Sequence, residues 1–141
     1  MSFTAQVDTW VSKSKRRMDA VFRESVQRLI EDAQTPRGHG GRMPVDTGFL
    51  RASGQISLSA MPAANAERQN GVSYAWSPHD VSVRLAGARM GETVYFGWTA
   101  SYAPHVEYGA RGRSPALFMR GAAAKWQHIV RGVVAELRAR S

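Results

Sequence analysis

The feature that most constrains this chain is a set of apolar residues that recurs with the period of an α-helix between about Ala5 and Ala33. The set comprises Val7, Trp10, Val11, Met18, Val21, Phe22, Val26, Leu29 and Ile30. At 100° per residue these side chains fall within an arc of about 200°, and Arg16, Arg17 and Arg23 lie outside it. The helix should end before Thr35-Pro36, because the residue ahead of a proline avoids helical backbone angles. One long amphipathic helix is therefore expected, and its apolar face needs a partner surface.

Four shorter segments further along the chain alternate apolar and polar residues. They span residues 56–60, 72–77, 81–85 and 93–98. Alternation with a period of two is typical of strands that bury one face of a sheet. The short connections at Pro78-His79 and at residues 87–91 favour antiparallel neighbours, whereas the polar segment 61–70 is expected to be a mobile excursion. The pattern predicts an antiparallel sheet of about four strands.

The C-terminal segment carries a second helical pattern. Ser114-Pro115 is typical of an N-cap followed by proline at the first helical position. From there the apolar residues form one stripe, made of Phe118, Ala122, Trp126, Ile129, Val133 and Leu137. Arg120, Arg131 and Arg138 project within about 20° of one another on the opposite side. We therefore expect an α+β fold in which this helix and the long N-terminal helix pack on one face of the sheet.

The segment MPVDTGFLRAS, residues 43–53, combines residues that form turns with residues that begin helices. Asp46 or Thr47 can accept hydrogen bonds from the backbone N–H groups that open a helix, and capping is the favoured role for Asp46. Gly48 permits a tight bend. A short helix then follows, with Leu50 or the preceding phenylalanine directed inward. The segment is therefore interpreted as a corner that joins the long helix to the sheet.

Composition limits the kinds of site that the chain can carry. The sequence has 141 residues and no cysteine, which excludes disulfides, thiolate catalysis and cysteine-based metal sites. The four histidines include no pair at the i, i+4 spacing of a helical metal site. No apolar run reaches the ~18 residues of a membrane span, and the N-terminal residues lack the pattern of a secretory signal. We therefore expect a single domain over residues 1–141, made and kept in a cytosol, with no cofactor, metal or catalytic residues.

The net charge of +8 is concentrated towards the C-terminus. Residues 111–141 hold seven Lys and Arg against one acidic residue, whereas residues 52–110 hold three against four. A basic tail favours an anionic neighbour such as nucleic acid, an acidic protein surface or lipid headgroups, although it can also be a solvated helix face. The glycine-rich residues 35–44 follow a helix rather than a strand, so a surface loop is favoured over a phosphate-binding loop.

Three segments of the chain occur in a distinctive order. Residues 43–53 contain V-D-T-G-x-L-x-x-S, residues 102–109 read Y-A-P-H-V-E-Y-G, and residues 115–123 read P-A-L-F-M-R-G-A-A. Together they resemble the tail-component family of tailed bacteriophages, which are small head–tail connector or tail-completion proteins. The resemblance spans about residues 1–140. It departs from the family at residues 116–121, where relatives often read P-F-L-x-P-A.

The resemblance implies a virion structural protein without catalytic activity. Relatives assemble as a ring, commonly hexameric, at the neck between the portal-side connector or stopper and the tail terminator or tail tube. The ring completes the tail or joins it to the head, and DNA passes through it during ejection. The chain would then lie in the neck or tail of the virion and, during assembly, in the host cytoplasm, without membrane association.

Candidate contact residues lie in the second of the three segments. Subunits of a closed ring use two different surfaces, and tyrosine suits such a surface because it buries area while its hydroxyl group keeps a hydrogen bond. We expect Tyr102, His105, Glu107 and Tyr108 to contact the adjacent subunit. Glu107 would pair with an arginine of that subunit, although the two tyrosines could instead pack under their own loop.

The arginine row of the last helix, Arg120, Arg131 and Arg138, would line the lumen or meet an acidic connector surface. Contacts with DNA should be transient and non-specific, because many close phosphate contacts would hold it tightly at low salt. The main alternative is a freestanding basic nucleic-acid-binding protein, which the charge favours but no RRM-like, helix-turn-helix or zinc-finger pattern supports. An enzyme is less favoured still, since no G-x-S-x-G elbow or acid–base pair stands out.

Overall fold

The computed structural model describes residues 2–69, 71–110 and 112–140. Its elements, in chain order, are α1 (Phe3–Ala33), η1 (Arg37–His39), α2 (Phe49–Ala52), β1 (Gly54–Ser57), α3 (Pro78–Leu85), β2 (Tyr95–Trp98), α4 (Ala103–Tyr108), α5 (Phe118–Ala123) and α6 (Trp126–Arg140). The fold is α+β, as expected, but the sheet formed by the described residues has two strands rather than four.

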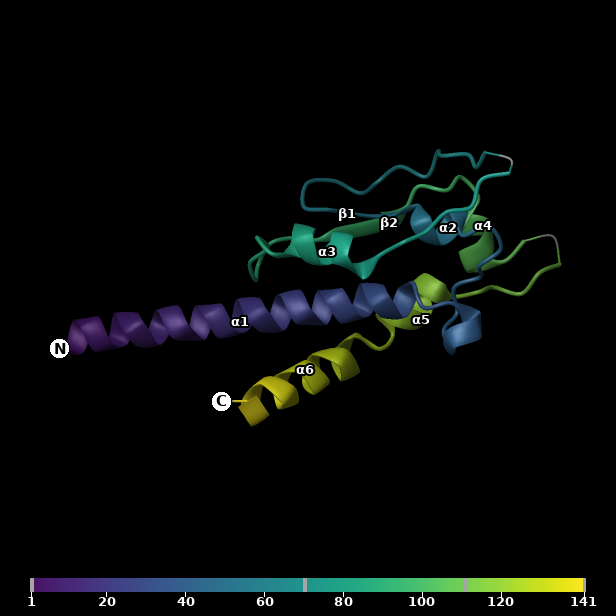
Figure 1. Ribbon diagram of the computed structural model, residues 1–141. Helices are drawn as coiled ribbons and strands as arrows, with labels where there is room; N and C mark the ends of the chain where they lie inside the picture. The colour runs from purple at the N-terminus through teal and green to yellow at the C-terminus, as the bar shows by residue number, and fades with distance from the viewer. Residues whose placement is uncertain (1, 70, 111, 141) are drawn as a thin grey trace.

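Helix α1 runs through the middle of the molecule (Figure 1). The small sheet and α3 lie on one side of it, and α6 lies along the other side. The expectation that both long helices cover one face of the sheet is therefore wrong. The C-terminal helix packs on α1 instead, because α1 itself offers the longest apolar surface in the chain.

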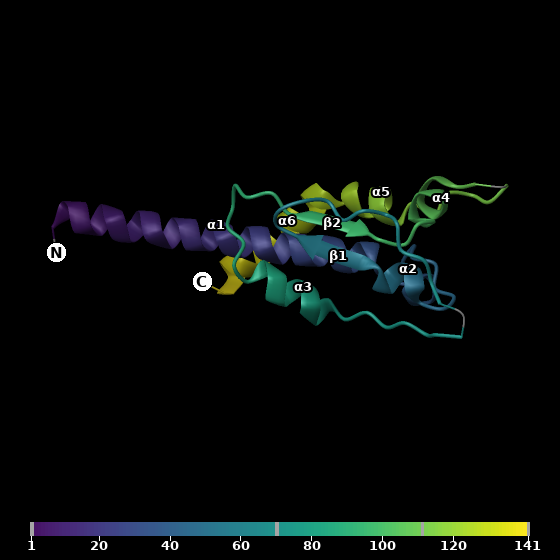
Figure 2. The same cartoon turned by 90° about the horizontal axis from the view of Figure 1, so that it is seen from above.

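The bounds of α1 agree closely with the sequence pattern. The Ser2 hydroxyl group accepts a hydrogen bond from the Ala5 N–H at 3.2 Å, and the helix ends with Gln34 as its C-cap, just before Thr35-Pro36. No glycine or proline interrupts its 31 residues. Its buried residues, however, all lie in the C-terminal part, and its N-terminal part projects beyond the rest of the chain (Figures 1 and 2).

The two strands form an antiparallel pair in which Gly54 lies opposite Trp98. Strand β1 ends at Ser57, whose hydroxyl group accepts hydrogen bonds from the N–H groups two and three residues later. This turn ends the strand, so the predicted strand 56–60 is shorter and begins earlier than expected. The predicted strand 93–98 is confirmed over the four residues of β2.

The predicted strand 81–85 is wrong, because residues 78–85 form helix α3. The Ser77 hydroxyl group accepts a hydrogen bond from the His79 N–H at 3.2 Å, and Pro78 occupies the first turn. Val81 and Leu85 are buried four residues apart, whereas Val83 between them is 60% exposed. The alternation over residues 81–85 is therefore also compatible with a helix, in which Val81 and Leu85 share one face as an i, i+4 pair. The Ser77-Pro78 sequence is typical of the start of such a helix.

The predicted strand 72–77 is also wrong. This segment belongs to no sheet, and it runs beside the corner, where the Tyr74 N–H donates to the Thr47 carbonyl oxygen at 3.0 Å. The long connection before it is held at Ala66, whose N–H donates to the Thr99 carbonyl oxygen and whose carbonyl oxygen accepts from the Ser101 N–H. Tyr74 and Trp76 are partly buried, as the alternation predicted, but among the described residues the segment pairs with neither strand of the sheet.

The predicted single C-terminal helix is two helices. Helix α5 begins at Phe118 rather than Pro115, and a turn at Ala124-Lys125 separates it from α6. The residue before α5, Leu117, adopts left-handed backbone angles with φ of 57°. The apolar stripe is nevertheless confirmed as core: Phe118, Ala122 and Val133 are buried, and Trp126, Ile129 and Leu137 are half-buried.

Two clusters of buried side chains hold these elements together. One lies around the sheet end, the corner and α5, and contains Met43, Phe49, Leu50, Trp98, Ala103, Ala116 and Phe118, among others. The other lies between α1 and α3, and contains Val26, Ile30, Val81, Leu85 and Ala88. Both use the C-terminal half of α1, so this half anchors the whole fold.

Candidate assembly surfaces

The three segments that carry the family resemblance meet in space. Phe49 of the corner lies 6.3 Å from Tyr102 between ring centroids. The Ala116 N–H donates to the Val106 carbonyl oxygen at 3.0 Å, which ties the third segment to the second. All three contribute side chains to the same buried cluster. Segments up to about 60 residues apart in sequence therefore form one structural unit.

The corner is built differently from the expected cap. Gly48, with φ of 85°, precedes α2, and a Cβ atom there would lie 2.3 Å from the Tyr74 carbonyl oxygen. The Thr47 hydroxyl group accepts a hydrogen bond from the Phe49 N–H at 3.3 Å. Asp46 is exposed and makes no capping hydrogen bond. Thr47 and Gly48 thus take the structural roles, Leu50 is buried as expected, and the capping role proposed for Asp46 is wrong.

A buried polar network joins this corner to α1, and the sequence analysis did not identify it. Gln34 at the end of α1 is fully buried, and its side-chain oxygen accepts a hydrogen bond from the Trp98 indole N–H at 2.9 Å. Its side-chain amide donates to the Arg51 carbonyl oxygen, and the Arg51 guanidinium donates back to the Gln34 carbonyl oxygen. Gly54 leaves room for this amide, since a Cβ atom there would lie 2.5 Å from it. The corner therefore does set α1 against the sheet.

Glu107 is a structural residue of its own chain. Its side chain is buried, with 3% of the residue exposed, although it lies in α4 near the surface. Its two carboxylate oxygens accept hydrogen bonds from the Met119 and Arg120 N–H groups, each at 2.9 Å. Because no side chain of the preceding residues caps α5, this carboxylate satisfies N–H groups at the start of that helix.

The arginine expected to pair with Glu107 also comes from the same chain. The Arg120 Nε group lies 3.4 Å from a Glu107 carboxylate oxygen, and the guanidinium carbon lies 4.4 Å from the centre of the Tyr108 ring. We therefore remove Glu107 from the set of subunit contacts. Arg120 does not share a helix with Arg131 and Arg138, because it lies in α5, where it pairs with Glu107 while half of its side chain stays exposed.

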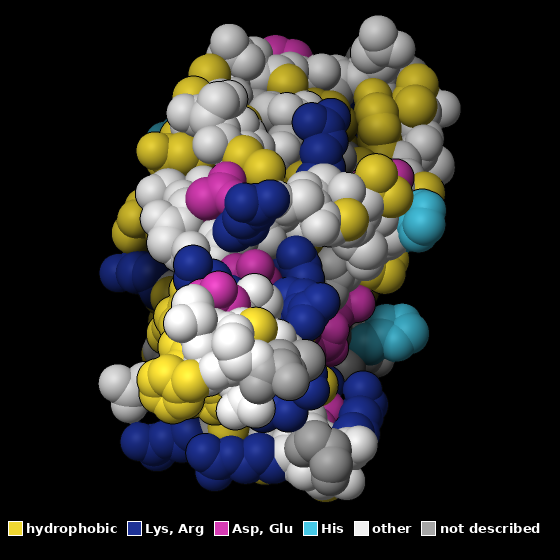
Figure 3. Space-filling view, turned by 90° about the vertical axis from the view of Figure 1, so that its left-hand side faces the viewer, with side chains coloured by type: hydrophobic (Ala, Val, Ile, Leu, Met, Phe, Trp, Pro, Cys, Tyr) yellow, Lys and Arg dark blue, Asp and Glu magenta, His cyan; other side chains and the backbone are white. Residues whose placement is uncertain are grey.

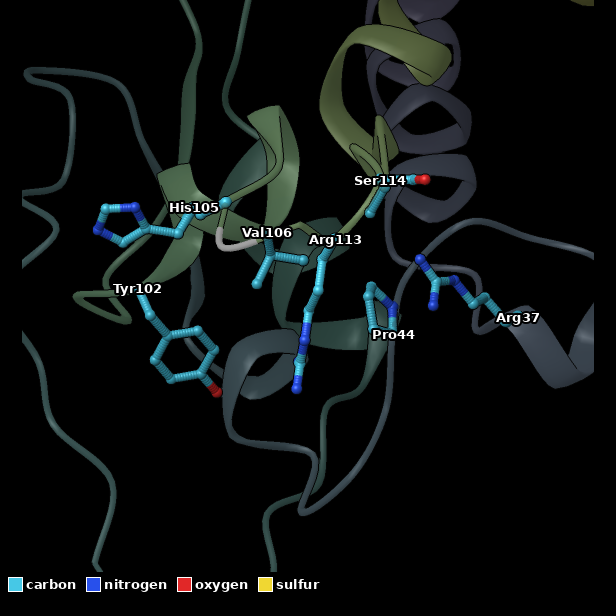
Figure 4. A pocket seen from close by; sticks show the side chains of 9 residues that line it. Arg37, Pro44, Tyr102, His105, Val106, Arg113 and Ser114 are labelled. Atoms are coloured by element: carbon cyan, nitrogen blue, oxygen red, sulfur yellow. The ribbon is translucent and has the colours of Figure 1, made fainter.

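Two of the three remaining predicted contact residues line a surface cavity of about 820 Å³. Tyr102 and His105 line it together with Arg37 of η1 and Arg113 of the loop before α5 (Figure 4). Tyr108 lies outside this cavity and is 54% exposed. The polar side chains of the lining are thus two guanidinium groups, an imidazole and a phenol, of which the guanidinium groups are suited to binding a carboxylate or phosphate group.

The environment of this cavity raises the pKa of Tyr102. Partial burial raises the pKa of its phenol group above the ordinary value of 10.0, because the phenolate form is harder to solvate there. The positive charge of Arg68 opposes this effect, and Asp46 reinforces it. Tyr102 therefore stays protonated at neutral pH and can donate a hydrogen bond.

Arg131 and Arg138 remain on one exposed face of α6, since seven residues separate them and a helix turns by nearly two full turns over that distance. Figure 3, which looks along α1 from its N-terminal side, shows Lys and Arg side chains gathered at the lower end of this view, below the projecting helix. Arg131 and Arg138 are both exposed in the folded chain.

The projecting part of α1 carries an exposed apolar surface that the sequence pattern did not predict to be uncovered. Phe3 is 79% exposed, Val7 40% and Trp10 68%. We call these three residues the projecting stripe. Val7 and Trp10 belong to the apolar face that the sequence predicts, but the periodicity of α1 does not show that the strands beside it are only four residues long. A helix cannot bury an apolar face that extends beyond its partners.

Sites for other kinds of ligand are not evident in the parts of the chain that the structure describes. Within those residues no three His, Asp or Glu side chains are grouped so as to hold a metal ion. None of the described helices combines the length and the apolar character required to cross a membrane. Comparison with protein-family models, with curated proteins and with solved structures finds no match to this chain.

Proposed function

We propose that this chain is a virion structural protein of a tailed bacteriophage, which forms a ring at the head–tail interface. The observation that carries the proposal is the projecting stripe of α1. A helix that leaves a phenylalanine and a tryptophan exposed has an apolar surface suited to a partner protein. A protein of this kind works by assembly, and the ring would complete the tail or join it to the head, with DNA passing through.

The assignment to the neck depends on the family resemblance, which the spatial arrangement of its motifs supports. Residues that resemble the family pattern form the corner, the Glu107 cap and the start of α5, and these all pack in one cluster. The motifs therefore describe how such a domain is built. We infer that Tyr102, His105 and Tyr108, which the fold leaves at the surface, contact neighbouring copies or the adjacent connector and tail proteins.

The function is tested by deleting the gene for this chain from the phage genome and supplying wild-type or variant protein in its place. Without the chain, heads and tails should accumulate separately or with unfinished tails, as seen by electron microscopy. Wild type should restore joined particles, and Trp10→Asp should not. Val83→Asp is the matched control, because Val83 is also an exposed apolar residue on a helix, but lies on α3. Joined, infectious particles without the chain would refute the proposal.

The arginines of α6 favour a second candidate function, the binding of nucleic acid by the free chain. Arg131 and Arg138 should be replaced by glutamine together, leaving Arg120 in place because it is bonded to Glu107. If these side chains bind phosphates, affinity for duplex DNA should weaken, and the slope of its salt dependence should become shallower by about one unit for each arginine replaced. Negligible binding by both proteins at low salt would eliminate this candidate and the contact with DNA in the lumen.

A further inference from the structure

A groove between α1 and α6 has the form of a binding site for a third helix. Its volume is about 760 Å³, and it lies next to the point where α1 begins to project. Val130, Val134 and Leu137 of α6 form one wall, and Val21 and Phe22 of α1 belong to the opposite wall. We call this site the α1/α6 groove. Its walls are ridges of side chains on successive helical turns, between which the ridge of another helix can pack.

The projecting stripe matches one wall of this groove in spacing and length. Phe3, Val7 and Trp10 follow one another at intervals of four and three residues, and so do Val130, Val134 and Leu137. In both sets seven residue steps separate the first residue from the last, or about 10 Å at the rise of an α-helix. A stripe of this length can therefore lie along the whole wall.

The stripe cannot fill the groove of its own chain. It belongs to the same continuous helix that forms one wall of the groove, and no glycine or proline allows that helix to fold back. The occupant must come from another molecule. Any second copy of the chain carries a stripe of the required spacing.

The charges around the two surfaces agree with this pairing. Arg16, Arg17 and Arg138 line the groove beside its apolar walls. Residues 2–12 of the projecting segment carry a single charged side chain, Asp8, in a chain whose net charge is +8. The segment thus brings no Lys or Arg side chain to the basic rim of the groove, whereas most other surfaces of a second copy would bring further positive charge.

We propose that the projecting stripe of α1 docks into the α1/α6 groove of a second copy of this chain. The inference deepens the proposed function, on which it rests, by naming the two surfaces through which copies join. Because the stripe and the groove are different surfaces, one copy can bind a neighbour on each side, as the subunits of a closed ring must. Phe3 and Trp10 supply the large buried area that such a contact needs.

The absence of cysteine permits a direct test by disulfide cross-linking. Val7→Cys is placed in one preparation of the full chain and Val134→Cys in another, which carries a tag of different mass. Both positions are the middle residues of their sets, so they come close whichever way the helix lies in the groove. A mixed disulfide should form on the order of a hundredfold faster than between Val7→Cys and Val83→Cys, because docking raises the local concentration of the thiols.

Two outcomes of the cross-linking would overturn the proposal. One is a mixed disulfide that forms no faster than with the Val83→Cys control. The other is preferential pairing of Val7→Cys with itself, which would mean that stripes pack on stripes. Sedimentation of the full-length Trp10→Asp and Val83→Asp proteins gives an independent reading: the first should lose at least about tenfold in self-association, and the second should retain it. Equal self-association by both would also overturn the proposal.

The result is separable from that of the deletion experiment. If the cross-link forms but particles without the chain are still joined and infectious, the contact is correct and the neck function is wrong. If joined particles require the chain but Val7 and Val134 positions do not cross-link, the function stands and the copies join through other surfaces. Circular dichroism of each variant verifies that the helices remain folded, as expected because Val7, Trp10 and Val83 are exposed and Val134 is half-buried.

Discussion

The two halves of α1 share one apolar stripe but have different environments. In the C-terminal half Val26 and Ile30 are buried against α3 and its neighbours, and Gln34 is fixed by hydrogen bonds to Arg51 and Trp98. In the N-terminal half Phe3 and Trp10 lie open to solvent. Periodicity predicts both halves equally well. It identifies a helix and its apolar face, but it cannot say whether the same chain or a second molecule covers that face.

Of the substitutions that test this difference between the two halves of α1, Ile30→Ala should have the largest effect on the free energy of unfolding. Ile30→Ala removes buried methyl groups from the cluster between α1 and α3 and leaves a cavity there. We expect a loss of about 2–5 kcal/mol in the free energy of unfolding, measured by urea denaturation at a protein concentration low enough to avoid self-association. A loss as small as that of an exposed substitution would mean that the C-terminal half is not packed as described.

A smaller loss is expected at Gln34. Gln34→Ala leaves the Trp98 indole N–H and the Arg51 carbonyl oxygen without their partner in a buried place. The expected cost is about 1–3 kcal/mol in the free energy of unfolding. Gln34→Glu provides a companion variant that keeps the acceptor for Trp98 but loses the N–H donor to Arg51. If Gln34→Ala unfolds at the wild-type urea concentration, the network does not hold the corner to α1.

The ion pair between Arg28 of α1 and Glu136 of α6 should stabilise the fold only in part of the pH range. Hydrogen bonds from Arg28 hold the pKa of Glu136 below its ordinary value of 4.5. A carboxylate whose pKa is lower in the folded chain than in the unfolded chain stabilises the fold at pH values above its unfolded pKa. This stabilisation is lost as the pH falls through the folded pKa. Glu136→Gln should therefore unfold slightly more readily than wild type at neutral pH, and the difference should disappear in strong acid. A difference that persists at low pH would contradict this.

The smallest effect on folding should come from the projecting half. Trp10→Ala should change the free energy of unfolding of the dilute chain by no more than about 0.5 kcal/mol, because the side chain is mostly in water. Urea denaturation repeated at increasing protein concentration sharpens the comparison. Wild type should become more stable as copies associate, and the variant should not. A large loss of stability in the dilute variant would show that the projecting half packs on its own chain.

The parts of the fold that the sequence predicted are those that local patterns determine. Helix α1 follows from an uninterrupted period and a proline that ends it, and the inward position of Leu50 follows from the short corner helix. Helix α3 was missed because Val81, Val83 and Leu85 satisfy a strand pattern, while only two of them satisfy the helical one that the structure adopts.

Features that depend on partners distant in sequence were not predictable in the same way. The start of α5 at Phe118 is set by the carboxylate of Glu107, which arrives from another helix, rather than by Ser114-Pro115. Of the predicted contact residues, Tyr102, His105 and Tyr108 remain at or near the surface, and Glu107 does not. An acidic residue in a loop motif gives no local sign of whether it faces a neighbour or its own chain.

The carboxylate of Glu107 also links the outer surface of the molecule to its interior. Helix α5 has six residues, too few to persist by itself, and its first turn is completed by a group that belongs to α4. Helix α5 in turn packs on α1. A neighbouring molecule that pulled on Tyr108 or His105 would therefore exert force on the first turn of α5. Through α5 the same force would reach α1. A force applied to α4 is therefore transmitted through α5 to α1, and is not confined to a surface loop.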